Sequence, residues 1–134
     1  AYTLLNEQYR MHPKISQWPS AFYYAGQVKD AETVKDHYRI LPQLKNAPNF
    51  FAPYSFIHVS GKELSEGRSF YNKEEYTLLE NMLDFLKKHY AIQIETQVGV
   101  ITFYKAQAEY IKKGLEKTYP QLKIQTVDSF QGSE

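Results

Sequence analysis

Cysteine is absent from the 134 residues, so neither disulfide bonds nor cysteine-bound zinc can stabilise this chain. Excess charge is also nearly absent, because 16 basic side chains stand against 15 acidic ones and leave a formal net charge of +1. A chain with so little net charge has no global positive field that would attract nucleic acid. Any nucleic-acid binding must therefore come from a local patch or from a partner domain.

Several functional patterns are missing as well. No apolar run is long enough to span a bilayer as a helix, and no signal-peptide pattern is present, so we expect no membrane partner. The sequence contains no Ser/His/Asp nucleophile motif and no glycine-rich phosphate loop followed by Lys-Ser/Thr. The histidines are scattered without metal-ligand spacing, and we expect no metal site at His12, His37, His58 and His89.

The composition that remains is that of a globular protein. Apolar residues make up 43% of the chain and charged residues 23%, which excludes a disordered chain. A length of 134 residues is sufficient for one domain with a hydrophobic core. Twelve tyrosines and eight phenylalanines indicate that either the interior or the surface is rich in aromatic rings.

The first part of the chain carries few regular patterns. Leu4 and Leu5 end a short apolar run that predicts a buried strand, and the polar segment after them predicts a loop at its carboxyl end. Pro13 and Pro19 each suit the first position of a helix, so we expect two short helices in succession, the second ending at Gly26. Residues 27–53 mix charges, prolines and isolated apolar side chains, which predicts an irregular surface excursion.

A strand and a helix are predicted in the middle of the chain. Residues 54–59 alternate in polarity and predict a strand, and residues 61–69 predict a loop. The helix begins after Asn72, where Asn72 and Glu75 have the spacing of a capping box. Apolar side chains then recur at helical spacing, and basic residues fill the last turn around residue 88.

The last third of the chain predicts two further strands around a helix. Residues 98–103 form a nearly continuous apolar run, which is typical of a strand covered on both faces. A helix is predicted at residues 105–117 and another strand at residues 124–127. The order of strands and helices predicts an α/β fold with a parallel sheet and right-handed crossovers.

The front loop holds the first candidate functional residues. The planar guanidinium of Arg10 can bind phosphate oxygens, the ring of Tyr9 can stack on a base, and the amide of Gln8 can bind a base edge or a phosphate-bound water. Residue types alone favour a structural alternative, in which Arg10 pairs with a surface carboxylate and Tyr9 packs into the core.

The end of the chain holds a second group. Gly132 would let the backbone approach a ligand, and Glu134 would accept a hydrogen bond from a ribose hydroxyl. Thr126, Asp128 and Ser129 would place hydroxyls and a carboxylate at a strand end. The structural alternative is a plain turn with local side-chain-to-backbone hydrogen bonds, and residue types alone again favour it.

The third group closes the strand at residues 98–103. If residues 102–105 are exposed at the carboxyl edge of the sheet, they can hold a nucleic-acid strand through phosphate contacts and stacking. In the alternative, Phe103 and Tyr104 are part of the core and Thr102 caps the following helix. The residue types favour neither explanation.

Three stretches in this order resemble motifs of superfamily 1B helicases. Residues 8–13 (QYRMHP) resemble the motif after the third helicase motif, residues 99–107 (GVITFYKAQ) the fourth motif, and residues 126–134 (TVDSFQGSE) the fifth. The chain thus resembles the second RecA-like domain of the group that holds the up-frameshift RNA helicase and senataxin. The resemblance covers essentially all of residues 1–134, and residues 52–56 are closer to senataxin-like members.

The resemblance implies a nucleotide site at five positions. Arg10 would be the catalytic residue that contacts the γ-phosphate of ATP. Tyr9 would stack near the adenine, and Gln8 would help to hold the nucleotide. Gly132 and Glu134 would lie near the ribose and the phosphates.

The resemblance also implies a nucleic-acid track. Thr102, Tyr104, Thr126 and Ser129 would lie near the backbone of the bound strand. The sequence departs from the family pattern at Phe103, where the family usually has proline. The local shape of this loop is therefore expected to differ.

The implied fold is a RecA-like parallel sheet with helices on both faces, incomplete at the C-terminus. The first RecA-like domain, with its phosphate loop and Mg²⁺-binding acidic motif, and the sixth helicase motif are not in the sequence. We therefore expect a fragment whose partner is the first RecA-like domain of the same polypeptide. ATP and Mg²⁺ are expected in the full-length enzyme, whereas the fragment alone is expected to be inactive with no bound cofactor.

The expected function is part of an ATP-dependent helicase, or translocase, that acts on single-stranded RNA or DNA. Family resemblance places it inside the cell and favours the nucleus over the cytoplasm. The alternative is a non-catalytic helicase-like module that docks protein or RNA, and the irregular residues 27–53 motivate it.

Overall fold

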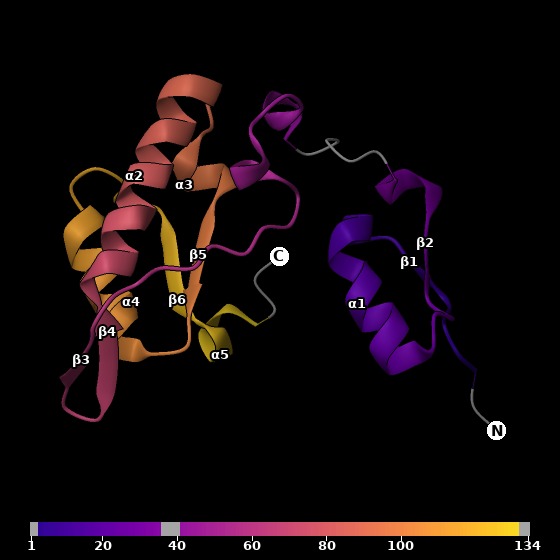
Figure 1. Cartoon of the computed structure of the whole chain (residues 1–134), viewed down its shortest axis with the longest axis horizontal. Coiled ribbons are helices and arrows are strands. Elements are labelled where there is room, and N and C mark those ends of the chain that lie inside the picture. Colours follow the sequence, from indigo (N-terminus) through magenta and orange to yellow (C-terminus); the bar gives the residue numbers. More distant parts are fainter. Residues whose placement is uncertain (1–2, 36–40, 132–134) are drawn as a thin grey trace. The chain divides into compact units, whose positions relative to one another are not determined.

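The computed structural model describes residues 3–35 and 41–131, and these residues belong to two compact units (Figure 1). The first unit is residues 1–57 and the second is residues 58–134, within the described ranges. Each unit is described by itself below. Among the described residues, no helix is long and apolar enough to cross a membrane.

The first unit is built around a parallel strand pair. Strand β1 (Glu7–Gln8) pairs with β2 (Lys29–Asp30), and helix α1 (Pro13–Tyr24) connects them. Gln8 lies opposite Asp30 in this register. A strand, a helix and a parallel strand therefore bring residues 8 and 30 together although 22 positions separate them.

Two expectations for this region are wrong. Leu4 and Leu5 are not part of a strand, and Leu5 is 85% exposed, because the pairing strand begins only at Glu7. The two short helices are one continuous helix, in which Pro19 lies inside α1. The helix ends at Tyr24, and Ala25 and Gly26 follow with φ angles of +50° and +75°.

Residues 27–53 hold β2 and three short 3₁₀ helices within the described part of the chain. These helices are η1 (Glu32–Val34), η2 (Pro42–Leu44) and η3 (Asn49–Phe51). Ala31 and Val34 are buried, so the segment contributes core residues to the first unit. Sequence patterns did not indicate β2, because a two-residue strand has no visible periodicity.

The second unit starts with an antiparallel hairpin that the sequence did not predict. Strands β3 (Glu63–Glu66) and β4 (Ser69–Asn72) are joined by a tight turn, in which Gly67 has a φ of +61° that favours glycine. The predicted loop at residues 61–69 is therefore wrong. The predicted strand at residues 54–59 is also wrong, because these residues have no strand pairing.

Helix α2 (Lys73–Tyr90) begins where the sequence predicts it. Asn72 Oδ1 accepts a hydrogen bond from the backbone N–H of Glu75 at 3.0 Å, which confirms the N-cap. The second half of the capping box is wrong, because the N–H of Asn72 donates to Oε1 of Gln107 at 2.7 Å and not to Glu75. The short helix α3 (Ile94–Gln97) follows.

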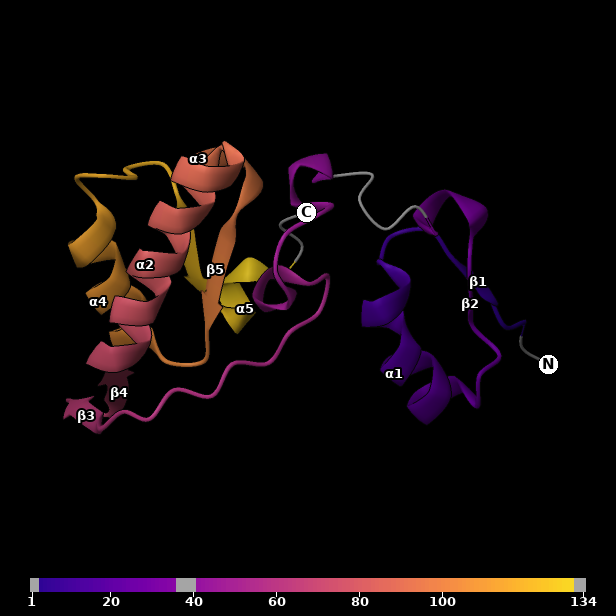
Figure 2. The ribbon, with the colours of Figure 1, turned by 45° about the horizontal axis from the view of Figure 1, so that its top comes forward.

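The predicted strand–helix–strand unit at the end of the chain is confirmed. Strands β5 (Gly99–Thr102) and β6 (Lys123–Thr126) pair in parallel, and α4 (Lys105–Leu115) connects them and packs on both. Helix α5 (Val127–Phe130) follows β6 directly. Figures 1 and 2 show α2 and α4 side by side, next to the hairpin.

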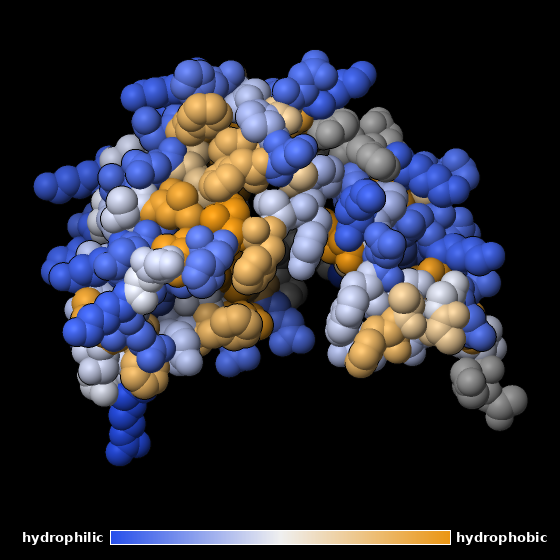
Figure 3. Space-filling view, viewed as in Figure 1, coloured by the Kyte–Doolittle hydropathy of each residue, from blue (hydrophilic) through white to orange (hydrophobic). Residues whose placement is uncertain are grey.

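The core of the second unit lies between these helices and the β5–β6 pair. Its buried side chains come from α2, α3, α4, β6 and their connections: Leu83, Ile92, Ile94, Ala106, Ala108, Ile111, Leu115, Tyr119, Leu122 and Ile124. Ile101 of β5 is 50% exposed, and apolar side chains are visible over α3 and β5 in Figure 3. The short parallel pairs and their helices form an α/β structure consistent with an incomplete RecA-like fold.

Candidate functional site

The front loop, residues 9–12, connects β1 to α1 and is held by Gln8. Oε1 of Gln8 accepts hydrogen bonds from the backbone N–H groups of Arg10 at 3.1 Å and Met11 at 2.7 Å. Nε2 of Gln8 donates to the carbonyl of Met11 and to Oδ1 of Asp30, both at 2.7 Å. The amide side chain therefore fixes the backbone that carries Tyr9 and Arg10.

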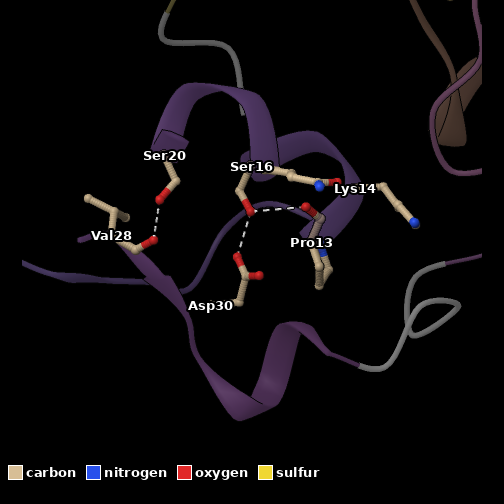
Figure 4. Close-up of a pocket in the computed structure, with 7 residues that line it drawn as sticks. Pro13, Lys14, Ser16, Ser20, Val28 and Asp30 are labelled. Atoms are coloured by element: carbon tan, nitrogen blue, oxygen red, sulfur yellow. Dashed lines mark hydrogen bonds between the residues drawn. The ribbon is translucent and has the colours of Figure 1, made fainter. Parts of the chain in front are cut away.

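Asp30 anchors this arrangement from the second strand. Its Oδ1 also accepts a hydrogen bond from the hydroxyl of Ser16, a buried residue of α1, at 2.5 Å (Figure 4). The Ser16 hydrogen bond is the main reason that the pKa of Asp30 lies below its usual range, with a further contribution from Gln8. Burial acts in the opposite direction on this pKa. Gln8, Ser16 and Asp30 thus link β1, α1 and β2, and we call them the Asp30 network.

Helix α1 starts immediately after the front loop. Nδ1 of His12 accepts a hydrogen bond from the backbone N–H of Lys14 at 2.9 Å, and Pro13 occupies the first helical turn. Beside the network lies a hollow of about 290 Å³ (Figure 4), lined by Pro13, Lys14, Ser16, Gln17, Ser20, Val28 and Asp30. The hydroxyl of Ser20 donates to the carbonyl of Val28 at its other end.

The front loop presents Tyr9 and Arg10 at the surface. Tyr9 is 63% exposed, so the alternative that its ring packs into the core is wrong. A side-chain hydrogen bond to Glu7 and the negative charge of Glu7 raise the pKa of Tyr9. Arg10 is exposed as well. Both side chains therefore lie on a loop whose backbone is fixed and whose surface is accessible to a ligand.

In the second unit, two predicted residues meet at the carboxyl ends of the parallel strands. Thr102 of β5 and Thr126 of β6 are direct partners in the strand register. Ser129 belongs to the same group, because its Oγ lies 3.1 Å from Oγ1 of Thr126. Three of the four residues predicted for the nucleic-acid track therefore lie together at one edge of the sheet.

Thr126 and Ser129 line an open hollow of about 450 Å³, which we call the α4–β6 hollow. Sequence reasoning had not selected Lys112 or Gln125, which also line it together with Phe103, Lys105, Ala108, Glu109 and Asp128. Lys112 was missed because it lies two helical turns after Lys105, and only the helix brings both residues to the same hollow.

Tyr104, the fourth predicted residue, is arranged differently. Its ring packs edge to face on Phe70 of the hairpin, with a centroid distance of 5.3 Å. Phe103 is 85% exposed, so the alternative that it belongs to the core is wrong. Thr102 does not cap α4, because its hydroxyl bonds to the backbone of Tyr104, whereas Ser69 Oγ accepts from the N–H of Ala106 at 3.0 Å.

The remaining candidates lie outside the described residues. Gly132 and Glu134 belong to the predicted nucleotide site, and the structure does not describe them. Within residues 3–35 and 41–131, no group of three or more His, Asp or Glu side chains could hold a metal ion. The described residues therefore offer a candidate phosphate-binding loop and a candidate strand-binding edge, each in its own unit.

Residues 1–134 match a protein family described as an AAA domain. The chain belongs to this family. It is 36% identical over 138 residues to the helicase sen1 of Schizosaccharomyces pombe, and it is 34% identical over 140 residues to the Drosophila melanogaster homologue of regulator of nonsense transcripts 1. It is also 34% identical over 142 residues to an uncharacterized ATP-dependent helicase of Methanocaldococcus jannaschii.

These alignments cover 97% to 98% of the chain but only part of each relative. The chain spans 8% of the sen1 helicase, 11% of the Drosophila protein and 20% of the archaeal helicase. The match over the whole chain confirms the resemblance to the superfamily 1B helicase group with sen1-like and up-frameshift-like members.

Proposed function

We propose that this AAA domain is one half of the motor of an ATP-dependent helicase that acts on RNA or DNA. The observation that carries the proposal is the front loop, where Gln8 and Asp30 hold the backbone beneath the exposed Arg10. A guanidinium on a preorganised loop can stabilise charge that develops on a transferred phosphoryl group. The printed names of the sen1 and archaeal relatives, helicase and ATP-dependent helicase, support the same activity.

In this proposal the nucleotide binds between two RecA-like domains. Arg10 contacts the γ-phosphate, and the exposed ring of Tyr9 stacks near the adenine. Gln8 supports the nucleotide site by holding the front loop in place, because both the oxygen and the nitrogen of its amide already form hydrogen bonds within the unit. Gly132 and Glu134 complete this half of the site near the ribose and the phosphates.

ATP brings Mg²⁺ to the full-length enzyme. The described residues offer no cluster of acidic side chains for this ion, so its ligands would come from the first RecA-like domain of the same polypeptide. That domain also supplies the phosphate loop that the present sequence does not contain. The partner domain would therefore hold the metal and provide the phosphate loop, and Arg10 would add a positive charge at the γ-phosphate.

The second unit would hold a single strand of nucleic acid. Thr102, Thr126 and Ser129 offer hydroxyls at the carboxyl edge of β5 and β6, and Lys105 and Lys112 offer ammonium groups beside them. Such groups suit the phosphates and sugars of a strand, which both RNA and DNA possess.

The proposed cellular location rests on the family resemblance, which favours the nucleus over the cytoplasm.

Replacement of Arg10 by alanine tests the proposal in the full-length protein that carries this chain. We expect ATP turnover in the presence of single-stranded nucleic acid to fall by at least about 100-fold, because the charge on the transferred phosphoryl group loses a donor. The matched control is Arg68→Ala, which removes an exposed guanidinium from the hairpin turn and should leave turnover unchanged.

Turnover of Arg10→Ala at the wild-type level would exclude the proposed role of Arg10. If the wild-type protein binds nucleic acid but hydrolyses no ATP, the non-catalytic docking module would replace the motor as the preferred function. The assay therefore separates the two functions that the sequence allows.

A further inference from the structure

The turn after β5 displays Phe103 at the protein surface. Oγ1 of Thr102 accepts a hydrogen bond from the N–H of Tyr104 at 3.1 Å, so the threonine side chain fixes the backbone on both sides of Phe103. The Phe103 side chain is 85% exposed and lines the α4–β6 hollow. The fold thus holds a flat aromatic face in solvent, beside the groups that are proposed to bind a nucleic-acid backbone.

The ring of Tyr104 is less available than that of Phe103 for stacking on a base. Its ring packs against Phe70 in an edge-to-face arrangement, and its exposed fraction is 46%. A base that stacked on Tyr104 would have to share this ring with the hairpin. Phe103 has no ring contact among the described aromatic pairs, so its two faces remain available for stacking.

The charges around the hollow indicate that phosphate attraction alone would contribute little to nucleic-acid affinity, so an aromatic contact would add to it. Lys105 and Lys112 are balanced by Glu109 and Asp128, and Nζ of Lys105 lies 4.0 Å from Oε1 of Glu109. With no local excess of positive charge, and a net charge of only +1 for the chain, attraction of phosphates is weak. Stacking of a base on an aromatic ring does not depend on net charge.

We infer that Phe103 is a stacking platform for one base of a bound single strand of nucleic acid. The inference rests on the proposed nucleic-acid function and adds a base contact to a track of backbone contacts. Because every base has a flat face, this contact raises affinity without selecting a sequence. The strand would place its backbone toward Thr126, Ser129 and Lys112 and one base on Phe103.

A series of oligonucleotides with one missing base tests this contact in the full-length protein. All have the same length and backbone, and each lacks the base at a different position. At one position we expect the missing base to weaken binding by the wild-type protein about tenfold. Phe103→Ala should weaken binding of the intact strand to the same extent, and the missing base at that position should then cause no further loss.

Two further variants serve as controls. Phe103→Trp keeps a stacking face and should bind the intact strand as the wild type does. Phe56→Ala removes an equally exposed phenylalanine, 86% exposed, from outside the hollow and should leave affinity unchanged. Thermal unfolding of Phe103→Ala should match the wild type, because little of the side chain is buried.

The inference is overturned if Phe103→Ala binds the intact strand as the wild type does. It is also overturned if the losses from Phe103→Ala and from the missing base simply add, because the two groups would then not touch. Either result leaves the proposed nucleic-acid function standing. A wild-type protein that binds no single strand at all would overturn both.

Discussion

At the scale of single residues, Gln8 shows how a motif residue can fix the backbone of its own loop. The sequence predicts a polar side chain near a ligand, whereas the structure uses all of its hydrogen-bonding capacity to hold the loop and to reach Asp30. The partner Asp30 could not be predicted, because it lies 22 residues away in a segment without a visible pattern. Exposure of Tyr9 and Phe103 was equally unpredictable, because residue type alone does not distinguish a core ring from a surface ring.

Acidification should lower the free energy of unfolding of the first unit, because Asp30 becomes protonated. Its pKa is lowered in the folded state, so the carboxylate contributes stability at pH values above the unfolded pKa of about 3.9, and this contribution disappears as the pH falls through the folded value. Asp30→Asn keeps an oxygen acceptor for Ser16 and Gln8 but does not titrate.

The measurement is urea unfolding of the wild type and Asp30→Asn at a series of pH values. The wild type should be more stable at neutral pH, because hydrogen bonds to a charged acceptor are stronger, and this difference should shrink below pH of about 4. Asp84→Asn is the control, since Asp84 lies in the second unit and its pair with Lys88 at 3.2 Å is at the exposed surface, where an ion pair contributes little stability. A difference that stays constant down to low pH would contradict the assigned role of Asp30.

At the scale of elements, local patterns predicted helices α2 and α4 and strands β5 and β6, but they missed the other four strands and divided α1 into two helices. The cap at Asn72 and the apolar spacing of α2 and α4 are local properties of the sequence, and the structure confirms both helices. The pairing of β1 with β2 and the β3–β4 hairpin depend on partners that no local pattern specifies. The predicted strand at residues 54–59 failed for the same reason, since alternation without a pairing partner does not make a strand.

Gln107 should be a strong determinant of the packing between α4 and the start of α2. It is buried, accepts from Asn72 N–H at 2.7 Å and donates to the carbonyl of Asn72 at 3.2 Å. Gln107→Leu would leave both backbone groups without this partner and should lower the free energy of unfolding by about 1–3 kcal/mol. Lys113→Leu, an exposed position on the same helix, should change it by less than about 0.5 kcal/mol in urea unfolding. Equal stability of the two variants would contradict the assignment.

Gly114 should tolerate no side chain, although alanine is the better helix former. A Cβ at this position would collide with the ring of Tyr76 on α2. Two contacts hold that ring in place: its hydroxyl donates to Glu80 at 2.5 Å, and it forms an edge-to-face pair with Tyr110 at a centroid distance of 5.3 Å. Burial and Glu80 raise the pKa of Tyr76 to about 12.

Gly114→Ala is therefore expected to lower the free energy of unfolding by about 1–2 kcal/mol, since the collision exceeds the gain in helix propensity. Urea unfolding of Gly114→Ala beside Lys113→Ala on the same helix provides the measurement. A Gly114→Ala variant more stable than the wild type would mean that α2 and α4 do not pack as described.

At the scale of the whole molecule, the chain is two compact units with complementary proposed tasks. The first unit carries Arg10 on the front loop, whose backbone Gln8 holds. The second unit carries the carboxyl edge of β5 and β6, with Phe103 beside it. The family was predictable from the sequence because three motifs in fixed order specify it, and the match over residues 1–134 confirms it. The groups that would face Arg10 in the proposed site could not be predicted, because residues 1–134 contain no phosphate loop.

The central claim is that Arg10 acts on the phosphoryl group of ATP. Its most direct test is the single-turnover rate of ATP cleavage by the full-length protein bound to a single strand, for the wild type, Arg10→Ala and Arg68→Ala. We predict that Arg10→Ala slows this chemical step by at least about 100-fold, while Arg68→Ala cleaves ATP at the wild-type rate. A cleavage rate of Arg10→Ala equal to that of Arg68→Ala would contradict the account.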